Sequence, residues 1–323
     1  MVAGGALRVV FFGTPEFAVP TLEALLGSRH TVIAAVTQPD RPRGRGQKTS
    51  PAPVKARALM AGLPVLQPER LKDPAFMESL AALGADLGVV AAYGKILTDA
   101  VLATPRLGLI NVHASLLPRY RGAAPVHRAV IAGERETGVT IMRVVKALDA
   151  GPMLSTVRRP IAPEDTSDEV ERDLARLGAQ LLVDTTDDIA AGRSRETPQD
   201  DAAATYAHRL TKDDGVVDWD WPADRVHNLV RGLHPWPHAF TFHQGRRFIL
   251  RRSVVMSPAP EAPAVPDPPG TIVEAAGDQL VVATGAGRLR LTEIQAEGKR
   301  PMTAREFLAG HRLAPGDRFS PNP

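Results

Sequence analysis

Two polar residues, Asn111 and His113, end an apolar run that begins at Leu107 and has the composition of a buried β-strand. Side chains two positions apart on a strand project from the same face, so the carboxamide and the imidazole are expected to enter one pocket. Held side by side, these two groups can stabilise a developing oxyanion. Either residue alone is more often a structural polar group, so the interpretation depends on a third partner.

Asp149 is the candidate partner, in the sequence Leu148-Asp149-Ala150-Gly151 that follows a later strand. An aspartate before a small residue and a glycine is usually a turn former. If the fold brings the two loops together, its carboxylate can accept a hydrogen bond from His113 and orient the ring. The set of Asn111, His113 and Asp149 therefore predicts an active site rather than three unrelated polar positions.

The composition limits the classes of protein that can contain such a site. The chain has 323 residues, of which 44% are hydrophobic, and this length favours two globular domains. It has no cysteine, which excludes disulfides, thiolate metal sites and cysteine nucleophiles. The first residues lack the pattern of a secretory signal, and no run of about 18 apolar residues occurs, so we expect a cytoplasmic protein without a membrane span.

The order of strand and helix patterns predicts how the candidate site is held. Apolar runs predict strands at 7–12, 31–36, 85–92, 107–113 and 138–145, and helical spacing occurs at 17–26, 75–83, 125–132 and 166–191. Strands that are apolar on both faces and alternate with helices are typical of an α/β domain with a mostly parallel, Rossmann-like sheet. Ligands of such sheets bind beyond the carboxyl ends of the strands, where Asn111 and His113 fall.

The remainder of the chain has a different character. The segment 192–208 is polar, charged and contains Pro198, so it is interpreted as a linker between a first domain at 1–191 and a second at 209–323. Short strand patterns at 247–255, 270–274, 279–284 and 288–294, several of them separated by glycine turns, predict a small β-barrel in the second domain. The proline-rich stretch 257–270 is expected to be a surface loop.

Two common nucleotide-binding motifs are absent. The turn Gly13-Thr14-Pro15 follows the first strand, but a dinucleotide fingerprint requires G-x-G-x-x-G at this position. No G-x-x-x-x-G-K-[ST] phosphate loop occurs either. The sequence therefore gives no support to a nicotinamide oxidoreductase, a kinase or an ATPase.

Several motifs connect the candidate residues to a known family. They are Phe12-Gly13-Thr14-Pro15, Thr37-Gln38-Pro39-Asp40-Arg41-Pro42, Gly44-Arg45-Gly46, Tyr93-Gly94, Asn111-Val112-His113, Ser115-Leu116-Leu117-Pro118 and Leu148-Asp149-Ala150-Gly151. On these residues the chain resembles the methionyl-tRNA formyltransferase family over nearly its whole length. The Asn, His, SLLP and Asp set is shared by formyltransferases that use 10-formyltetrahydrofolate, so it indicates the reaction and the co-substrate but not the acceptor.

The resemblance implies a role for each candidate residue. Asn111 and His113 would stabilise the oxyanion of the tetrahedral intermediate, and Asp149, with an ordered water, would help to move a proton from the attacking nitrogen to the leaving one. The residues expected to bind the folate are Ser115, Leu116, Leu117 and Pro118, with the segment 93–97 opposite them. The implied reaction requires no metal.

The acceptor is inferred from two other features. Residues 41–57 contain six basic residues and no acidic one, and this segment resembles the insertion with which the family holds the acceptor arm of the tRNA. Arg45 matches the family's important arginine, and we expect Arg43 and Lys48 to contact the tRNA with it. The second domain resembles the family's oligonucleotide-binding (OB-like) barrel, whose positive charge would come from Arg246, Arg247, Arg251 and Arg252. The expected partner is initiator methionyl-tRNA, and we expect a monomer.

Two other interpretations remain open at this point. A formyltransferase with the same chemistry could act on an amino sugar nucleotide or another small amine, which would leave the basic segment without a role. A tRNA-binding protein with a lapsed active site is a second possibility, although the presence of Asn111, His113 and Asp149 disfavours it. A basic run is by itself most often a solvated surface, so an acceptor assay decides among these functions.

Overall fold

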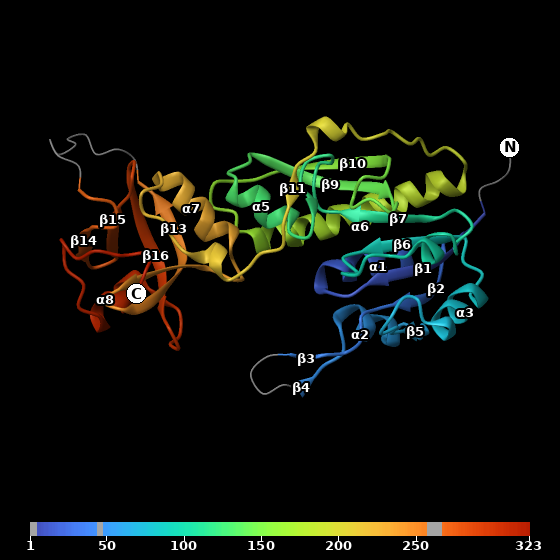
Figure 1. Ribbon diagram of the computed structural model, residues 1–323, viewed down its shortest axis with the longest axis horizontal. Coiled ribbons are helices and arrows are strands. Elements are labelled where there is room, and N and C mark those ends of the chain that lie inside the picture. Colours follow the sequence, from blue (N-terminus) through green and yellow to red (C-terminus); the bar gives the residue numbers. More distant parts are fainter. Residues whose placement is uncertain (1–4, 44–47, 257–266) are drawn as a thin grey trace. The chain divides into compact units, whose positions relative to one another are not determined.

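The computed structural model of the protein describes residues 5–43, 48–256 and 267–323 (Figure 1). The chain forms two compact units. The first unit contains residues 1–125, 136–159 and 171–207, and the second contains residues 126–135, 160–170 and 208–323. Residues 192–207 therefore belong with the first unit, although their composition is that of a linker. Within the described residues, no helix is both long and apolar enough to span a membrane.

A seven-stranded sheet forms the centre of the first unit (Figure 1). Its strands are β1 (Arg8–Gly13), β2 (Thr31–Val36), β5 (Val65–Leu66), β6 (Leu87–Ala91), β7 (Leu109–His113), β9 (Glu136–Arg143) and β10 (Met153–Pro160). Their order is β10-β9-β7-β6-β1-β2-β5. Pairing is parallel from β5 to β7, whereas β9 is antiparallel to β7. The expected mostly parallel sheet is confirmed, and β10 is a strand that the sequence analysis did not predict.

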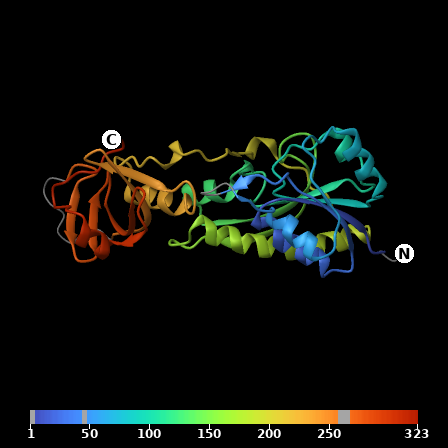
Figure 2. The ribbon, with the colours of Figure 1, turned by 90° about the horizontal axis from the view of Figure 1, so that it is seen from below.

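Helices cover both faces of this sheet (Figure 2). They are α1 (Val19–Leu26) after a 3-10 turn, η1 (Glu16–Ala18), α2 (Pro53–Met60), α3 (Pro74–Ala82), α4 (Asp99–Leu102) and α6 (Ser167–Ala190). On one face, Phe76 and Leu80 of α3 lie in a buried cluster with Val10 and Phe12 of β1. On the other face, α6 comes so close to β7 and β9 that a Cβ on Gly178 would lie 2.9 Å from a Val112 methyl group. The expected two-sided covering of the sheet is thus present.

The basic segment 41–57 is not one continuous loop. Its first part contains a short antiparallel pair, β3 (Pro42–Arg43) with β4 (Lys48–Thr49), and its end lies in α2. Proline at the first position of α2 suits a helix start, because its missing N–H is not needed there. Residues 53–57 of the basic segment are therefore helical. Arg45 lies outside the described residues.

The second unit contains an antiparallel sheet of six strands. They are β12 (Ala239–His243), β13 (Arg246–Val255), β14 (Ile272–Ala276), β15 (Gln279–Ala283), β16 (Arg288–Ala296) and β17 (Met302–Thr303). This unit also contains most of the helices α5 (Pro125–Ile131), α7 (Ala223–Gly232) and α8 (Ala304–Gly310) and the 3-10 turn η3 (Asp213–Gly215). The C-terminal tail bridges the two ends of the sheet, because Ser320 pairs with Phe242 and Arg318 pairs with Thr271. This closure gives the barrel-like form that the short strands predict. Residues 257–266 of the expected proline-rich loop lie outside the described residues.

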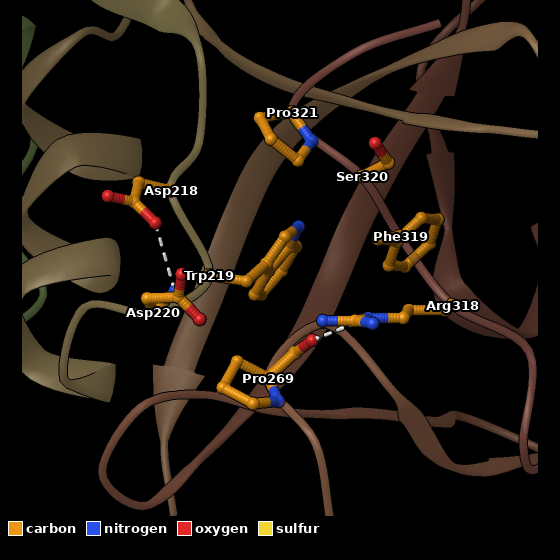
Figure 3. Close-up of a pocket in the computed structure, with 8 residues that line it drawn as sticks. All are labelled: Asp218, Trp219, Asp220, Pro269, Arg318, Phe319, Ser320 and Pro321. Carbon is orange, nitrogen blue, oxygen red and sulfur yellow. Dashed lines mark hydrogen bonds between the residues drawn. The ribbon is translucent and has the colours of Figure 1, made fainter.

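The tail also borders a small cavity in the second unit (Figure 3). Trp219 and Phe319 stack with ring centroids 5.8 Å apart, and the indole N–H of Trp219 donates to the Thr241 hydroxyl at 3.0 Å. The cavity of about 210 Å³ lies beside this pair and contains none of the predicted catalytic residues. Since both rings are almost fully buried, the tail acts here as part of the barrel core.

A turn between α7 and β12 carries two histidines close to an arginine of β13. His238 has a left-handed backbone with φ of 68°, and Arg251 donates to its Nε2 at 2.6 Å. An imidazole nitrogen that accepts from a guanidinium must be unprotonated, so this ring is neutral. Burial, together with the charges of Arg251 and His234, lowers the pKa of His238 to about 4.

This lowered pKa predicts an acid-sensitive contribution to stability. The unfolded chain binds the His238 proton near pH 6.5 and the folded chain only near pH 4, so the contribution is complete above pH 6.5 and is lost as the pH falls toward 4. His238→Asn removes the titration, and asparagine tolerates the left-handed backbone. We expect the loss of unfolding free energy between about pH 7 and pH 4.5 to be about 1 kcal/mol smaller in the variant, after allowance for partial solvent exposure.

Denaturant titrations at several pH values measure this difference. The matched control is His208→Asn, which changes an exposed histidine. An unchanged pH dependence in His238→Asn, or the same change in His208→Asn, would contradict the assignment to His238.

Candidate active site

Strand β7 delivers Asn111 and His113 to one face of the first sheet. Leu109 lies in the buried cluster beneath α3, whereas Val112 faces α6. Because side chains alternate along a strand, Asn111 and His113 project on the same side as Leu109. His113 is buried and Asn111 is partly exposed. The strand thus holds both functional groups side by side, as the spacing predicts.

A main-chain carbonyl fixes the orientation of the His113 ring. Nε2 lies 2.9 Å from the carbonyl oxygen of Tyr120, which can only accept, so Nε2 carries a hydrogen. Nδ1 faces Asp149 at 3.7 Å from Oδ2, a distance too long for a hydrogen bond. The expectation that Asp149 orients the ring is therefore wrong for this structure, and Tyr120 has that role. The two groups are therefore close enough for an electrostatic interaction but do not form a direct hydrogen bond.

Of the three candidate catalytic groups, the Asn111 carboxamide has the fewest hydrogen bonds to the described part of the protein. No hydrogen bond to its side chain is formed by the described part of the chain, although both neighbouring strands pair with its backbone. A partly exposed carboxamide without a protein partner can give both N–H donors to a bound molecule. Its strand holds it in place, so it meets the requirement for a preorganised oxyanion donor.

Asp149 reaches the site from the opposite end of the sheet. Because β9 is antiparallel to β7, Arg143 pairs with Ile110, at the amino end of β7, rather than with His113. The loop after β9 must therefore fold back along β7 to bring the Asp149 carboxylate to His113. The carboxylate is held there by the Gly122 amide, which donates to Oδ2 at 2.8 Å.

Backbone strain is concentrated in the loops of this site. Among the described non-glycine residues with positive φ are Ala92, Tyr120 and Asp149, with φ of 45°, 60° and 47°. Left-handed backbone costs free energy in residues with a Cβ and persists only where the surroundings enforce it. These three residues lie in the loops after β6, β7 and β9, so the strained positions surround the candidate catalytic groups.

The Ser115–Pro118 loop is held by hydrogen bonds to Arg119, which follows it, and to Thr140 of β9. The Ser115 hydroxyl, which is fully buried, donates to the Arg119 carbonyl at 2.7 Å, and Thr140 accepts from the Leu117 amide at 3.2 Å. The Leu117-Pro118 peptide is cis. The Ser115 side chain is thus committed to the loop, whereas Leu116 and Pro118 are partly exposed.

Three further loops meet near the carboxyl ends of β1, β2 and β6. The Tyr93 carbonyl accepts from the Thr14 hydroxyl at 3.1 Å and from the Gln38 carboxamide at 2.8 Å. The Tyr93 phenol is buried without a hydrogen-bond partner among the described residues, and burial raises its pKa to about 12. Thr14 and Gln38 were not among the predicted site residues, although both belong to the motifs that carry the family resemblance.

The basic segment is partly neutralised by acidic residues outside it. Lys55 forms an ion pair with Asp40, and this contact holds the pKa of the Asp40 carboxyl below its usual value. Arg57 pairs with Glu23 at 2.7 Å. Arg43 and Lys48 lie opposite each other in β3 and β4. The free positive charge of the segment is therefore smaller than its composition indicates.

Three of the four arginines of β13 are also engaged with protein groups. Arg247 lies over the Phe240 ring at 3.8 Å, Arg251 contacts His238, and Arg252 pairs with Glu169 at 3.5 Å. Arg246, the fourth, is exposed, 5.8 Å from the Phe248 ring centroid. Three of these side chains therefore have structural contacts, which a nucleic acid would have to share or replace.

Comparisons with known proteins agree with this arrangement. Residues 7–186 match the formyl transferase family, and residues 209–312 match the formyl transferase C-terminal domain. A methionyl-tRNA formyltransferase of Heliobacterium modesticaldum is 49% identical over 97% of this chain and 100% of its own, and one of Moorella thermoacetica is 48% identical over 96% and 98%.

Among solved structures, an N-formyltransferase of Helicobacter canadensis, in complex with folinic acid and dTDP-3-aminofucose, has a TM-score of 0.69 at 15% identity, covering 90% of this chain and 99% of its own. At that identity the likeness shows the fold alone. The family matches and the full-length relatives, in contrast, cover both units. The chain therefore belongs to the methionyl-tRNA formyltransferase family.

Proposed function

We propose that this protein transfers the formyl group of 10-formyltetrahydrofolate to the α-amino group of methionine on initiator tRNA, for the initiation of translation. The observation that carries the proposal is the uncommitted Asn111 carboxamide beside His113 and Asp149, in a chain with both domains of the family. A cytoplasmic location and a monomeric state remain predictions.

The geometry supports a direct transfer between two nitrogens. The methionyl amine attacks the formyl carbon, which gives a tetrahedral intermediate with a negatively charged oxygen. Asn111 donates a hydrogen bond to that oxygen, and Nδ1 of His113 lies on the same strand face. The carbon–nitrogen bond to the folate then breaks, while the proton lost by the amine passes to the leaving nitrogen with the help of Asp149.

The folate would lie between the Ser115–Pro118 loop and residues 93–97. Ile96 supports this placement, because its apolar side chain is 83% exposed. Leu148, next to Asp149, is 56% exposed. Exposed apolar side chains beside polar groups are typical of a surface that a ligand covers. Ser115 would act by shaping the loop, since its hydroxyl is already bonded within it.

The tRNA is proposed to contact the basic segment through Arg43, Arg45 and Lys48. Lys55 and Arg57, at the helical end of the segment, are paired with Asp40 and Glu23. Arginine suits phosphate through its planar fork of donors. The second unit is proposed to bind the tRNA as well, with its exposed Arg246 as the first candidate.

Formyl transfer to alternative acceptors tests the function directly. With 10-formyltetrahydrofolate as donor, we expect transfer to methionine-charged initiator tRNA and little to charged elongator tRNA or an amino sugar nucleotide. Transfer to the sugar alone would retain the chemistry of the site and overturn the proposed acceptor. Binding of tRNA without transfer would indicate a lapsed active site.

Replacement of Asn111 tests the oxyanion donor. Asn111→Ala should lower kcat by roughly 10²- to 10³-fold, and Asn111→Asp at least as much, because a carboxylate cannot donate and repels the oxyanion. Steady-state kinetics with both substrates measure the loss, and thermal unfolding reports on folding. The control is Asn322→Ala in the exposed C-terminal tail. A loss of only a few-fold would remove Asn111 from the catalytic residues.

Replacement of Arg45 tests the basic segment. Arg45→Ala should raise KM for the tRNA, leave folate binding unchanged, and reduce the salt dependence of tRNA binding by about one counterion. The matched control is Arg57→Ala, which removes the same charge from a residue already paired with Glu23. Equal effects of the two variants, or equal losses of tRNA and folate binding, would contradict a specific tRNA contact.

A further inference from the structure

Gln199 lies at the centre of a hydrogen-bond network around the Asp149 loop. Its carboxamide nitrogen donates to two main-chain carbonyls, that of Asp149 at 2.8 Å and that of Gly151 at 2.7 Å. Its carboxamide oxygen accepts two hydrogen bonds from Arg121, at 3.0 Å and 2.8 Å. Every donor and acceptor of this side chain is thus used, and only one orientation of the amide satisfies them all.

Arg121 anchors this network, because it is buried and forms an ion pair of its own. Arg121 is 3% exposed, and its guanidinium also pairs at 2.7 Å with Asp201, in the short 3-10 turn η2 (Asp201–Ala203). The next residue, Gly122, donates its amide to the Asp149 carboxylate. Asp149 is therefore held at both polar ends, its carbonyl by Gln199 and its carboxylate by the main chain beside Arg121.

The segment that carries Gln199 is bound along its length to the first unit. We call residues 197–207 the strap. Thr197 exchanges two main-chain hydrogen bonds of 2.8 Å with Met153, and Thr205 accepts from the Arg121 amide and, through its hydroxyl, from the Tyr120 amide. At its end, β11 (Tyr206–Ala207) pairs in parallel with β8 (Arg121–Gly122). The strap thus joins the loop after β7 to the loop after β9.

We propose that Gln199 is a positioning residue for formyl transfer, which fixes the Asp149 carboxylate opposite His113 through its two hydrogen bonds to the Asp149–Gly151 turn. The inference rests on the proposed catalytic role of Asp149. The turn needs an external restraint, because Asp149 has a left-handed backbone, which costs free energy in a residue with a Cβ. A misplacement of about 1 Å in such a site can cost about 10²-fold in rate.

Two replacements of Gln199 separate positioning from simple packing. Gln199→Ala should lower kcat by about 10- to 100-fold with KM for both substrates unchanged. Gln199→Glu keeps the shape and a charged partner for Arg121, but it loses both donors to the turn. It should therefore lose kcat although the contact with Arg121 is kept. Gln180→Ala, an exposed glutamine bonded to Asp184, is the control.

A double variant shows whether Gln199 acts through Asp149. Asp149→Asn tolerates the left-handed backbone and keeps an acceptor for Gly122. In that background, Gln199→Ala should lower kcat by less than about 2-fold further, because the group that it positions no longer functions. Full multiplication of the two losses, a change in KM alone, or wild-type kcat in Gln199→Glu would overturn the inference.

Amide hydrogen exchange provides a readout that does not depend on activity. Gln199→Ala and Gln199→Glu should both accelerate exchange at Gly122 and in residues 148–152, whereas Gln180→Ala should not. Unchanged exchange would overturn the inference even in an inactive protein. Failure of the proposed function has a different signature, the absence of transfer to methionyl-tRNA by the unmodified protein.

Discussion

The hydrogen bond from the Gly122 amide to the Asp149 carboxylate joins two loops that reach β7 from opposite ends. The loop after β7 carries Tyr120, whose carbonyl orients His113, and the loop after β9 carries the carboxylate itself. This contact fixes the carboxylate relative to the loop that orients the ring. Because the candidate catalytic groups come from separate elements, their relative positions depend on the restraints between loops more than on any single strand.

Local sequence patterns were sufficient to predict the strand that carries Asn111 and His113. Its successive side chains point alternately toward α3 and toward α6, and this period of two specifies which side chains share a face. The partner of the His113 ring could not be predicted, because it is a main-chain carbonyl and any residue at position 120 has one. The antiparallel direction of β9 was also missed, since strand direction depends on pairing across the sheet and not on the composition of the strand.

The strap shows a second feature that amino-acid composition could not predict. Residues 192–208 are polar and contain Pro198, which is typical of a linker. Their hydrogen bonds, however, use the main chain and the carboxamide of Gln199, and such contacts leave no hydrophobic pattern. The same limit applies to positive charge, because Lys55, Arg57 and Arg252 each have an acidic partner distant in sequence. A count of basic residues therefore overestimates the charge that is free to meet a phosphate backbone.

The strap also sets the time at which the site is complete during synthesis. Residues that contain Asn111, His113 and Asp149 are made first, but the turn that holds Asp149 lacks its partner until residues 199–207 have followed. At a rate of about 5 to 20 residues per second, this delay lasts roughly 3 to 12 seconds. For that interval the candidate catalytic residues of the nascent chain lack the hydrogen bonds that the strap provides. The hydrogen bonds to this turn can therefore form only once the chain has been made up to the border of the second unit.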